Sequence, residues 1–126
     1  MSKNGYIVIH WVGAVSSARN NAMYFYDKDR QASAHYFVDD NEIWQCVHTK
    51  KYASWHVGGK KVSTKGGTYY GKCKNDNSIG IEMCCKKDSK GNLYITDKTI
   101  ERTARLVKWI QASYNIPDSH VIRHFD

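Results

Sequence analysis

The sequence has little proline and no long apolar run. Its one proline is Pro117, and it contains no low-complexity stretch and no internal repeat. No apolar run approaches the roughly 18–20 residues that a membrane-spanning helix requires. The first residues do not lead into the core of a signal peptide, because His10 interrupts the apolar stretch Tyr6–Ile9 at once. We therefore expect a protein with neither a membrane span nor an export signal.

The spacing of the cysteines excludes the common cysteine motifs. The four cysteines are Cys46, Cys73, Cys84 and Cys85, and none forms a C-x-x-C pair, so neither a thioredoxin-type redox site nor a cysteine zinc knuckle is indicated. Without an export signal, reduced thiols are the default expectation. A bridge from Cys73 to one of the other three stays open.

The length and composition are those of one small globular domain. The chain has 126 residues and a mass of 14.5 kDa, and its apolar fraction of 41% argues against disorder. Nineteen Lys and Arg against twelve Asp and Glu leave a net charge of +7. This charge indicates either a solubilising surface or an anionic partner, such as a nucleic acid or an acidic cell-surface polymer. Nucleic acid is disfavoured, because lysines and aromatic residues are not interleaved and no binding motif is present.

Apolar segments and turn signals predict an α/β domain. We expect strands at Tyr6–His10, His35–Val38, Ile43–Val47, Asn77–Cys85 and Val121–Ile122, a helix after Ser16 or Ser17, and a helix over Asp97–Tyr114. Asp39–Glu42 predicts a hairpin turn, and the glycine-rich stretch Gly58–Asn77 predicts a long surface loop. Strands and helices alternate, which favours layers around a mixed sheet.

The last predicted helix has clear signals at both ends. Thr96 is a plausible N-cap, and Pro117 stops the helix. Ile100, Ala104, Val107 and Ile110 recur at helical spacing, so we expect them to form the buried stripe.

Three polar residues lie where strands place them beside apolar neighbours. His10 ends the first predicted strand, on the face opposite Ile9. Glu82 lies between apolar residues on another strand, and such an acid must be paired, protonated or in a wet cleft. His124 directly follows the last strand. Two imidazoles and a carboxylate are the composition of a zinc hydrolase site.

A purely structural role for these three residues remains the alternative. A lone histidine is more often a satisfied polar residue than a metal ligand, and Glu82 is also compatible with a structural ion pair. The spacing does not decide, because the sequence has no H-E-x-x-H motif.

Five short segments carry a more specific signal. They are Ile9–Trp11, Ser33–Asp40 with Glu42–Gln45, Ala53–Gly58, Asn77–Glu82 and Arg123–Asp126. In this order they resemble the zinc-dependent N-acetylmuramoyl-L-alanine amidases of the type 2 family, which share a fold with peptidoglycan recognition proteins and many phage endolysins. The resemblance implies the fold of that family, a central mixed β-sheet flanked by helices.

The resemblance also implies roles for individual residues. His10 and His124 would be zinc ligands, and Glu82 the general base that activates the zinc-bound water and later protonates the leaving amine. The reaction would hydrolyse the amide between the lactyl group of N-acetylmuramic acid and L-alanine of the stem peptide. Trp55 and His56 fall where the family lines its substrate groove.

The remaining histidines receive structural interpretations. His35 falls in the family's central hairpin, where we interpret it as structural rather than as a ligand. His48 and His120 match no functional position, and we expect both at the surface.

The sequence departs from the family's pattern at its end. The family's third zinc ligand and an oxyanion-stabilising Lys lie beyond the second zinc histidine, and this chain stops two residues after His124. Three protein ligands are the rule in catalytic zinc sites, so we expect weak zinc binding and little cleavage from this chain. Our interpretation is one amidase domain over residues 1–126, truncated before the third ligand, with a C-terminal wall-binding domain possible in the full chain.

The alternative is a natural short form that binds muropeptide without cleaving it. Glu82 argues against it, because a non-catalytic relative has no use for a general base there. The implied partner is bacterial peptidoglycan, without nucleic acid or membrane, and we expect a monomer. The missing export signal favours cytoplasmic synthesis followed by release to the cell wall, as in phage endolysins.

Overall fold

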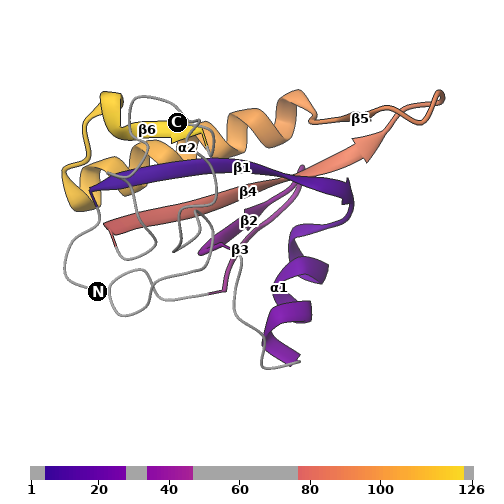
Figure 1. Cartoon of the computed structure of the whole chain (residues 1–126), viewed down its shortest axis with the longest axis horizontal. Helices are drawn as coiled ribbons and strands as arrows, with labels where there is room; N and C mark the ends of the chain where they lie inside the picture. The colour runs from indigo at the N-terminus through magenta and orange to yellow at the C-terminus, as the bar shows by residue number, and fades with distance from the viewer. Residues whose placement is uncertain (1–4, 28–33, 47–76, 124–126) are drawn as a thin grey trace, which may run out of the picture.

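Strands and helices alternate along the chain in the predicted order. The computed structural model describes residues 5–27, 34–46 and 77–123 (Figure 1). Its elements are β1 (Tyr6–Val15), α1 (Ala18–Asp27), β2 (Tyr36–Val38), β3 (Ile43–Gln45), β4 (Ser78–Lys87), β5 (Leu93–Tyr94), α2 (Asp97–Tyr114) and β6 (Val121–Arg123). The short β5 and a 3₁₀ turn at Asp118–His120 were not predicted. Within the described residues, no helix is long and apolar enough to cross a membrane.

The strands form the mixed sheet that the sequence predicts. Their order is β3-β2-β4-β1-β6, and β5 pairs with β4 beside this path. β1 pairs in parallel with β4 and β6, and β2 pairs in parallel with β4. β3 and β5 are antiparallel to their partners. In Figure 1, β1 and β4 run side by side through the middle of the molecule.

Each face of the sheet carries a hydrophobic cluster. The α2-side cluster comprises Ile7, Tyr36, Val38, Ile79, Ile81, Leu106, Val107, Ile110 and Ile116. The α1-side cluster comprises Ala18, Ala34, Phe37 and Cys84, with Val12, Trp44 and Cys46 packed against it. Alternate residues of β2 and β4 thus belong to different clusters, as the period of two in a strand requires.

The first strand is longer than its apolar segment. We predicted a strand that ends at His10, but β1 continues to Val15. The reason is its neighbour, because β4 pairs with β1 as far as Val15 and Cys85, with an irregularity after Trp11. Tertiary pairing thus extends the strand through exposed residues, and His10 lies in its middle rather than at its end.

The buried stripe of α2 also differs from the prediction. Ile100 is 50% exposed and Ala104 is exposed, whereas Thr99, Thr103, Leu106, Val107 and Ile110 are buried. The two threonines can be buried because their hydroxyl groups are satisfied. Thr99 donates to Asp40 Oδ1 at 2.9 Å, and Thr103 donates to the Thr99 carbonyl at 2.7 Å. Two threonines therefore take the buried positions in the first half of α2 that hydrophobicity alone would give to Ile100 and Ala104.

The ends of both helices follow the predicted signals. Ser17 Oγ accepts the Asn20 N–H at 3.1 Å, and Thr96 Oγ1 accepts the Thr99 N–H at 3.1 Å. α2 ends where Asn115 adopts the left-handed conformation, with φ 56°, and Pro117 follows two residues later. The caps were readable from the sequence because each depends on one short local segment.

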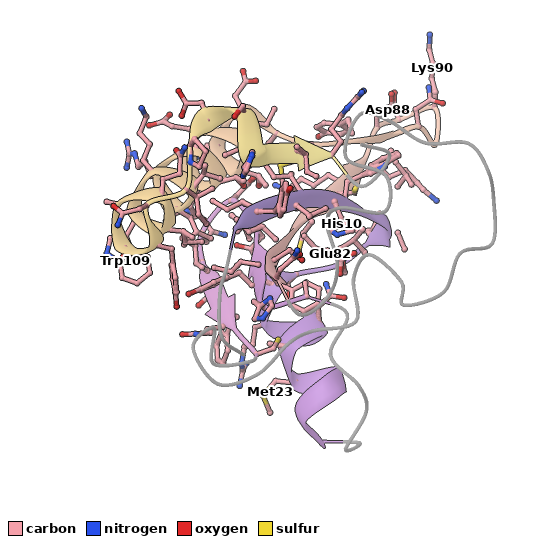
Figure 2. All side chains as sticks on the ribbon, turned by 60° about the vertical axis from the view of Figure 1, so that its left-hand side comes forward. His10, Met23, Glu82, Asp88, Lys90 and Trp109 are labelled. Atoms are coloured by element: carbon pink, nitrogen blue, oxygen red, sulfur yellow. The ribbon has the colours of Figure 1, made fainter. Side chains whose placement is uncertain are left out.

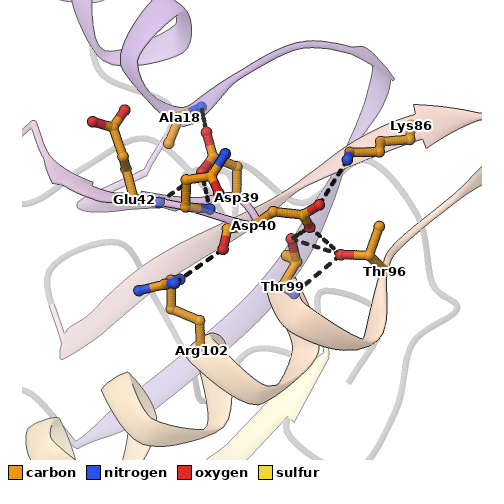
Figure 3. A network of polar contacts seen from close by, with 9 residues as sticks. Ala18, Asp39, Asp40, Glu42, Lys86, Thr96, Thr99 and Arg102 are labelled. Carbon is orange, nitrogen blue, oxygen red and sulfur yellow. Dashed lines mark hydrogen bonds and ion pairs between the residues drawn. The ribbon is translucent and has the colours of Figure 1, made fainter.

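The hairpin turn after β2 connects both helices to the sheet (Figure 3). Asp39 Oδ2 accepts the N–H of Ala18, the first residue of α1, at 2.9 Å. Its Oδ1 accepts the N–H groups of Asn41 and Glu42 at 2.8 and 2.7 Å, which shapes the turn itself. One carboxylate therefore satisfies a free N–H at the start of α1 and two within the turn.

Asp40 makes the corresponding connection to α2 and β4. Its carboxylate accepts from the hydroxyl groups of Thr96 and Thr99 at the start of α2, and it forms an ion pair with Lys86 at 2.6 Å. Arg102 donates to the Asp40 carbonyl at 2.9 Å. The hydrogen bond from Lys86, followed by that from Thr96, lowers the pKa of Asp40 to about 2.

We expect Asp40→Asn to lower the free energy of unfolding at pH 7 by about 1–2 kcal/mol, because the folded state holds the ionised carboxylate. The depressed pKa makes this contribution complete above the unfolded value, near 3.8, and removes it as the pH falls towards 2. Urea denaturation at pH 7 and at pH 2.5 measures the difference between variant and wild type, which should shrink at the lower pH.

Asp118→Asn is the matched control. Asp118 is exposed and accepts one hydrogen bond, from Gln111 Nε2 at 2.8 Å, so we expect a change within about 0.5 kcal/mol. An Asp40→Asn effect no larger than this, or one that persists undiminished at pH 2.5, would contradict the role assigned to the carboxylate.

Candidate functional site

The parallel pairing of β1 with β4 brings His10 and Glu82 together. The two residues are direct partners in the register of these strands, which lie about 4.8 Å apart in any sheet. Partnered residues project from the same face, and Figure 2 shows the two labelled side chains beside each other. Both are half-buried. The predicted meeting of an imidazole and a carboxylate from separate strands is thus present in the structure.

The side chains around Glu82 alternate between the two faces of the sheet. Ile79 and Ile81 belong to the α2-side cluster, and Cys84 belongs to the α1-side cluster. Glu82 therefore shares its face with α1, not with α2. The face that holds His10 and Glu82 is the one that α2 leaves free.

Cys46 is close enough to Glu82 to respond to its charge. Burial raises the pKa of the Cys46 thiol to about 11, and the negative charge of Glu82 adds to the increase. Cys46 follows β3 and packs against the α1-side cluster. Sequence reasoning did not associate Cys46 with Glu82, because nothing local links the end of β3 to the middle of β4.

His35 has the structural role that we predicted. It is fully buried, its N–H donates to the Gly80 carbonyl at 2.9 Å, and its Nδ1 accepts the Gly80 N–H at 3.0 Å. Because Nδ1 is an acceptor, the proton of the neutral ring is assigned to Nε2. His35 thus continues the contact of β2 with β4 beyond Tyr36. It bonds to Gly80, and each of these residues lies two positions before the pair Phe37 and Glu82.

His120 differs from its prediction as a surface residue. It is half-buried, its ring stacks on Tyr6 with centroids 4.5 Å apart, and its Nδ1 is 2.9 Å from the Gly5 carbonyl oxygen. The pairing of β6 with β1 explains the difference, because it brings the turn before β6 to the start of β1. His48 lies outside the described residues.

The described cysteines are reduced thiols, in accord with the default expectation. Cys46, Cys84 and Cys85 are free, and burial raises the pKa of Cys84 to about 12 and that of Cys85 above its usual value. Such thiols are poor nucleophiles and poor ligands near neutral pH. Cys73 lies outside the described residues.

Three of the predicted site residues belong to segments outside the described part of the chain. His124, Trp55 and His56 lie outside the described residues, as does nearly all of the predicted loop Gly58–Asn77. Within residues 5–27, 34–46 and 77–123, no group of three or more His, Cys, Asp or Glu side chains is arranged to hold a metal ion. The described part of the site therefore consists of His10 and Glu82 with their neighbours on the sheet.

Sequence comparison matches the chain to amidases. The profile of the family described as N-acetylmuramoyl-L-alanine amidase matches residues 2–126. A probable N-acetylmuramoyl-L-alanine amidase of Bacillus licheniformis is 33% identical over 128 residues, which cover 95% of this chain and 33% of that protein. The chain thus spans about a third of the length of such curated relatives.

Solved structures agree with the sequence comparison. The catalytic domain of XlyA is 28% identical, with a TM-score of 0.71 over 98% of this chain and 72% of that one. The Escherichia coli N-acetylmuramyl-L-alanine amidase AmiD, in complex with an anhydro-N-acetylmuramic acid peptide, is 26% identical, with a TM-score of 0.61 over 96% of this chain and 48% of that one. The predicted family and fold are therefore confirmed, and the chain belongs to the N-acetylmuramoyl-L-alanine amidase family.

Proposed function

We propose that this domain, within the complete gene product, hydrolyses the amide bond between N-acetylmuramic acid and L-alanine in bacterial peptidoglycan. The observation that carries the proposal is the direct pairing of His10 with Glu82 on the sheet face that α2 does not cover. Family membership supports the reaction class. The related amidase AmiD binds a muropeptide that contains L-alanine after the muramic acid, in keeping with this substrate.

Glu82 is the general base in this proposal. A carboxylate can take a proton from an attacking water and later return it to the leaving amine of L-alanine. Its half-buried position suits the task, because partial removal from water strengthens its interaction with the reacting groups. The imidazole beside it supplies a second polar group on the same face.

His10 and His124 would hold a zinc ion. The register of β1 with β6 pairs Val8 with Ile122 and Ile9 with Arg123. The assignment of His124 as the second ligand rests on the sequence resemblance, since this residue lies outside the described residues. Neutral imidazole is a ligand that zinc favours, and the position of His10 beside the carboxylate of Glu82 is compatible with a bound cation. Zinc bound there would supply a Lewis acid.

The remaining parts of the proposal concern substrate and location. Trp55 and His56 would line the groove that receives the muropeptide. The net charge of +7 suits an anionic cell wall. We further propose that the protein acts as a monomer and is released to the wall after synthesis in the cytoplasm.

We expect Glu82→Gln to reduce cleavage by about 10²–10⁴-fold, because the amide keeps the shape of the side chain but cannot accept the proton. The measurement is the release of L-alanine amino termini from purified peptidoglycan by the complete gene product. Glu101→Gln is the control, since Glu101 is an exposed residue of α2 that pairs with Arg105. Turnover by Glu82→Gln equal to that of the wild type would remove Glu82 from the mechanism.

A second experiment tests the alternative that the protein binds muropeptide without cleaving it. Calorimetry with a soluble muropeptide, followed by mass analysis of the ligand, separates binding from cleavage. Recovery of intact ligand after binding to the complete wild-type gene product would favour the non-catalytic module and refute the proposed reaction.

Zinc content tests the ligand assignment independently of activity. We expect His10→Ala to lower zinc affinity by at least ~10-fold, because each ligand contributes a large share of the binding where few protein ligands hold the metal. Elemental analysis and calorimetry with Zn²⁺ measure it. His120→Gln is the control, because His120 contacts Tyr6 and Gly5 rather than the site. Unchanged zinc binding by His10→Ala would refute the assignment.

A further inference from the structure

Four side chains form a row across the sheet on the face that carries His10 and Glu82. Antiparallel pairing joins Trp44 of β3 to Phe37 of β2, and parallel pairing joins Phe37 to Glu82 and Glu82 to His10. Paired residues of neighbouring strands are close enough for their side chains to touch. Glu82 therefore has an imidazole on one side and a phenyl ring on the other.

The phenyl ring is held in place from several directions. Phe37 is 1% exposed and packs with Ala18 of α1 and Cys84 of β4, and Trp44 packs against the same cluster. Asp39, two residues after Phe37, ties the start of α1 to the same hairpin through the Ala18 N–H. In such a close-packed region the ring cannot move aside without displacing a helix.

This side of Glu82 is a poor environment for a carboxylate. Among the described residues, the neighbours there include the aromatic residues of the row and the thiol of Cys46, whose pKa is raised by burial and by the charge of Glu82. Apolar surface solvates a carboxylate poorly. The opposite side offers the imidazole of His10. The surroundings thus favour side-chain rotamers that direct the carboxylate towards His10.

We propose that Phe37 is a positioning residue for Glu82. Its buried ring fills the space on the β2 side of Glu82 and restricts the carboxylate to rotamers directed towards His10. The catalytic consequence rests on the proposed function, in which Glu82 is the general base. The restriction of the Glu82 side chain does not depend on that function and can be measured without it.

Phe37→Leu in the complete gene product tests this role. Leucine keeps the site apolar but leaves space beside Glu82, so we expect kcat to fall by about 10-fold or more while KM changes by less than about twofold. Three-bond couplings measured by NMR should show one dominant χ1 rotamer of Glu82 in the wild type and averaging in the variant. If Phe37→Leu does not fold, Phe37→Met, whose flexible side chain fills the space beside Glu82 less rigidly than a phenyl ring, takes its place.

Val38→Ala is the matched control. Val38 is the next residue of β2, is fully buried and packs in the α2-side cluster on the opposite face. We expect it to lower stability but to leave kcat and the Glu82 rotamer unchanged. A single unchanged rotamer in Phe37→Leu, or an equal loss of kcat in Val38→Ala, would overturn the positioning role. A wild-type protein that does not cleave peptidoglycan refutes the proposed function instead, and the couplings then decide the positioning role alone.

Discussion

The parallel pairing of β1 with β4 is the interaction on which the rest of the structure depends. It places Ile7, Ile79 and Ile81 together against α2 and sets His10 beside Glu82 on the other face. A slip of one residue in either strand would turn its polar residue into the apolar α2-side cluster, because side chains alternate between faces. Burial of an imidazole or a carboxylate there would be costly. The hydrophobic core and the candidate site therefore enforce the same register.

The turn after β2 links this sheet to both helices. Asp39 holds the start of α1 and Asp40 holds the start of α2 and the end of β4, so two adjacent carboxylates connect elements that are far apart in the sequence. The turn also begins two residues after Phe37, which lies on β2. Contacts that stabilise the fold and contacts that shape the surroundings of Glu82 consequently meet in one short segment.

Membership of the amidase family and the geometry of the sheet support the same site from different directions. The family profile covers nearly the whole chain, and the register independently brings together two of the residues that the sequence resemblance selects. The register adds what a motif cannot supply, namely the neighbours of each residue. It shows that one side of Glu82 is aromatic and buried and that the other side is polar, an asymmetry suited to a carboxylate that must point in one direction.

The sequence by itself determined the order and type of the main elements and the cap at Thr96, and it restricted the cap of α1 to Ser16 or Ser17, because each depends on a few neighbouring residues. It also selected His10 and Glu82. Only the tertiary structure decided the length of β1, the burial of Thr99 and Thr103 in place of Ile100 and Ala104, and the position of Phe37 beside Glu82. These features depend on strand register and on hydrogen bonds between distant segments, and local patterns carry no information about which distant residues become partners.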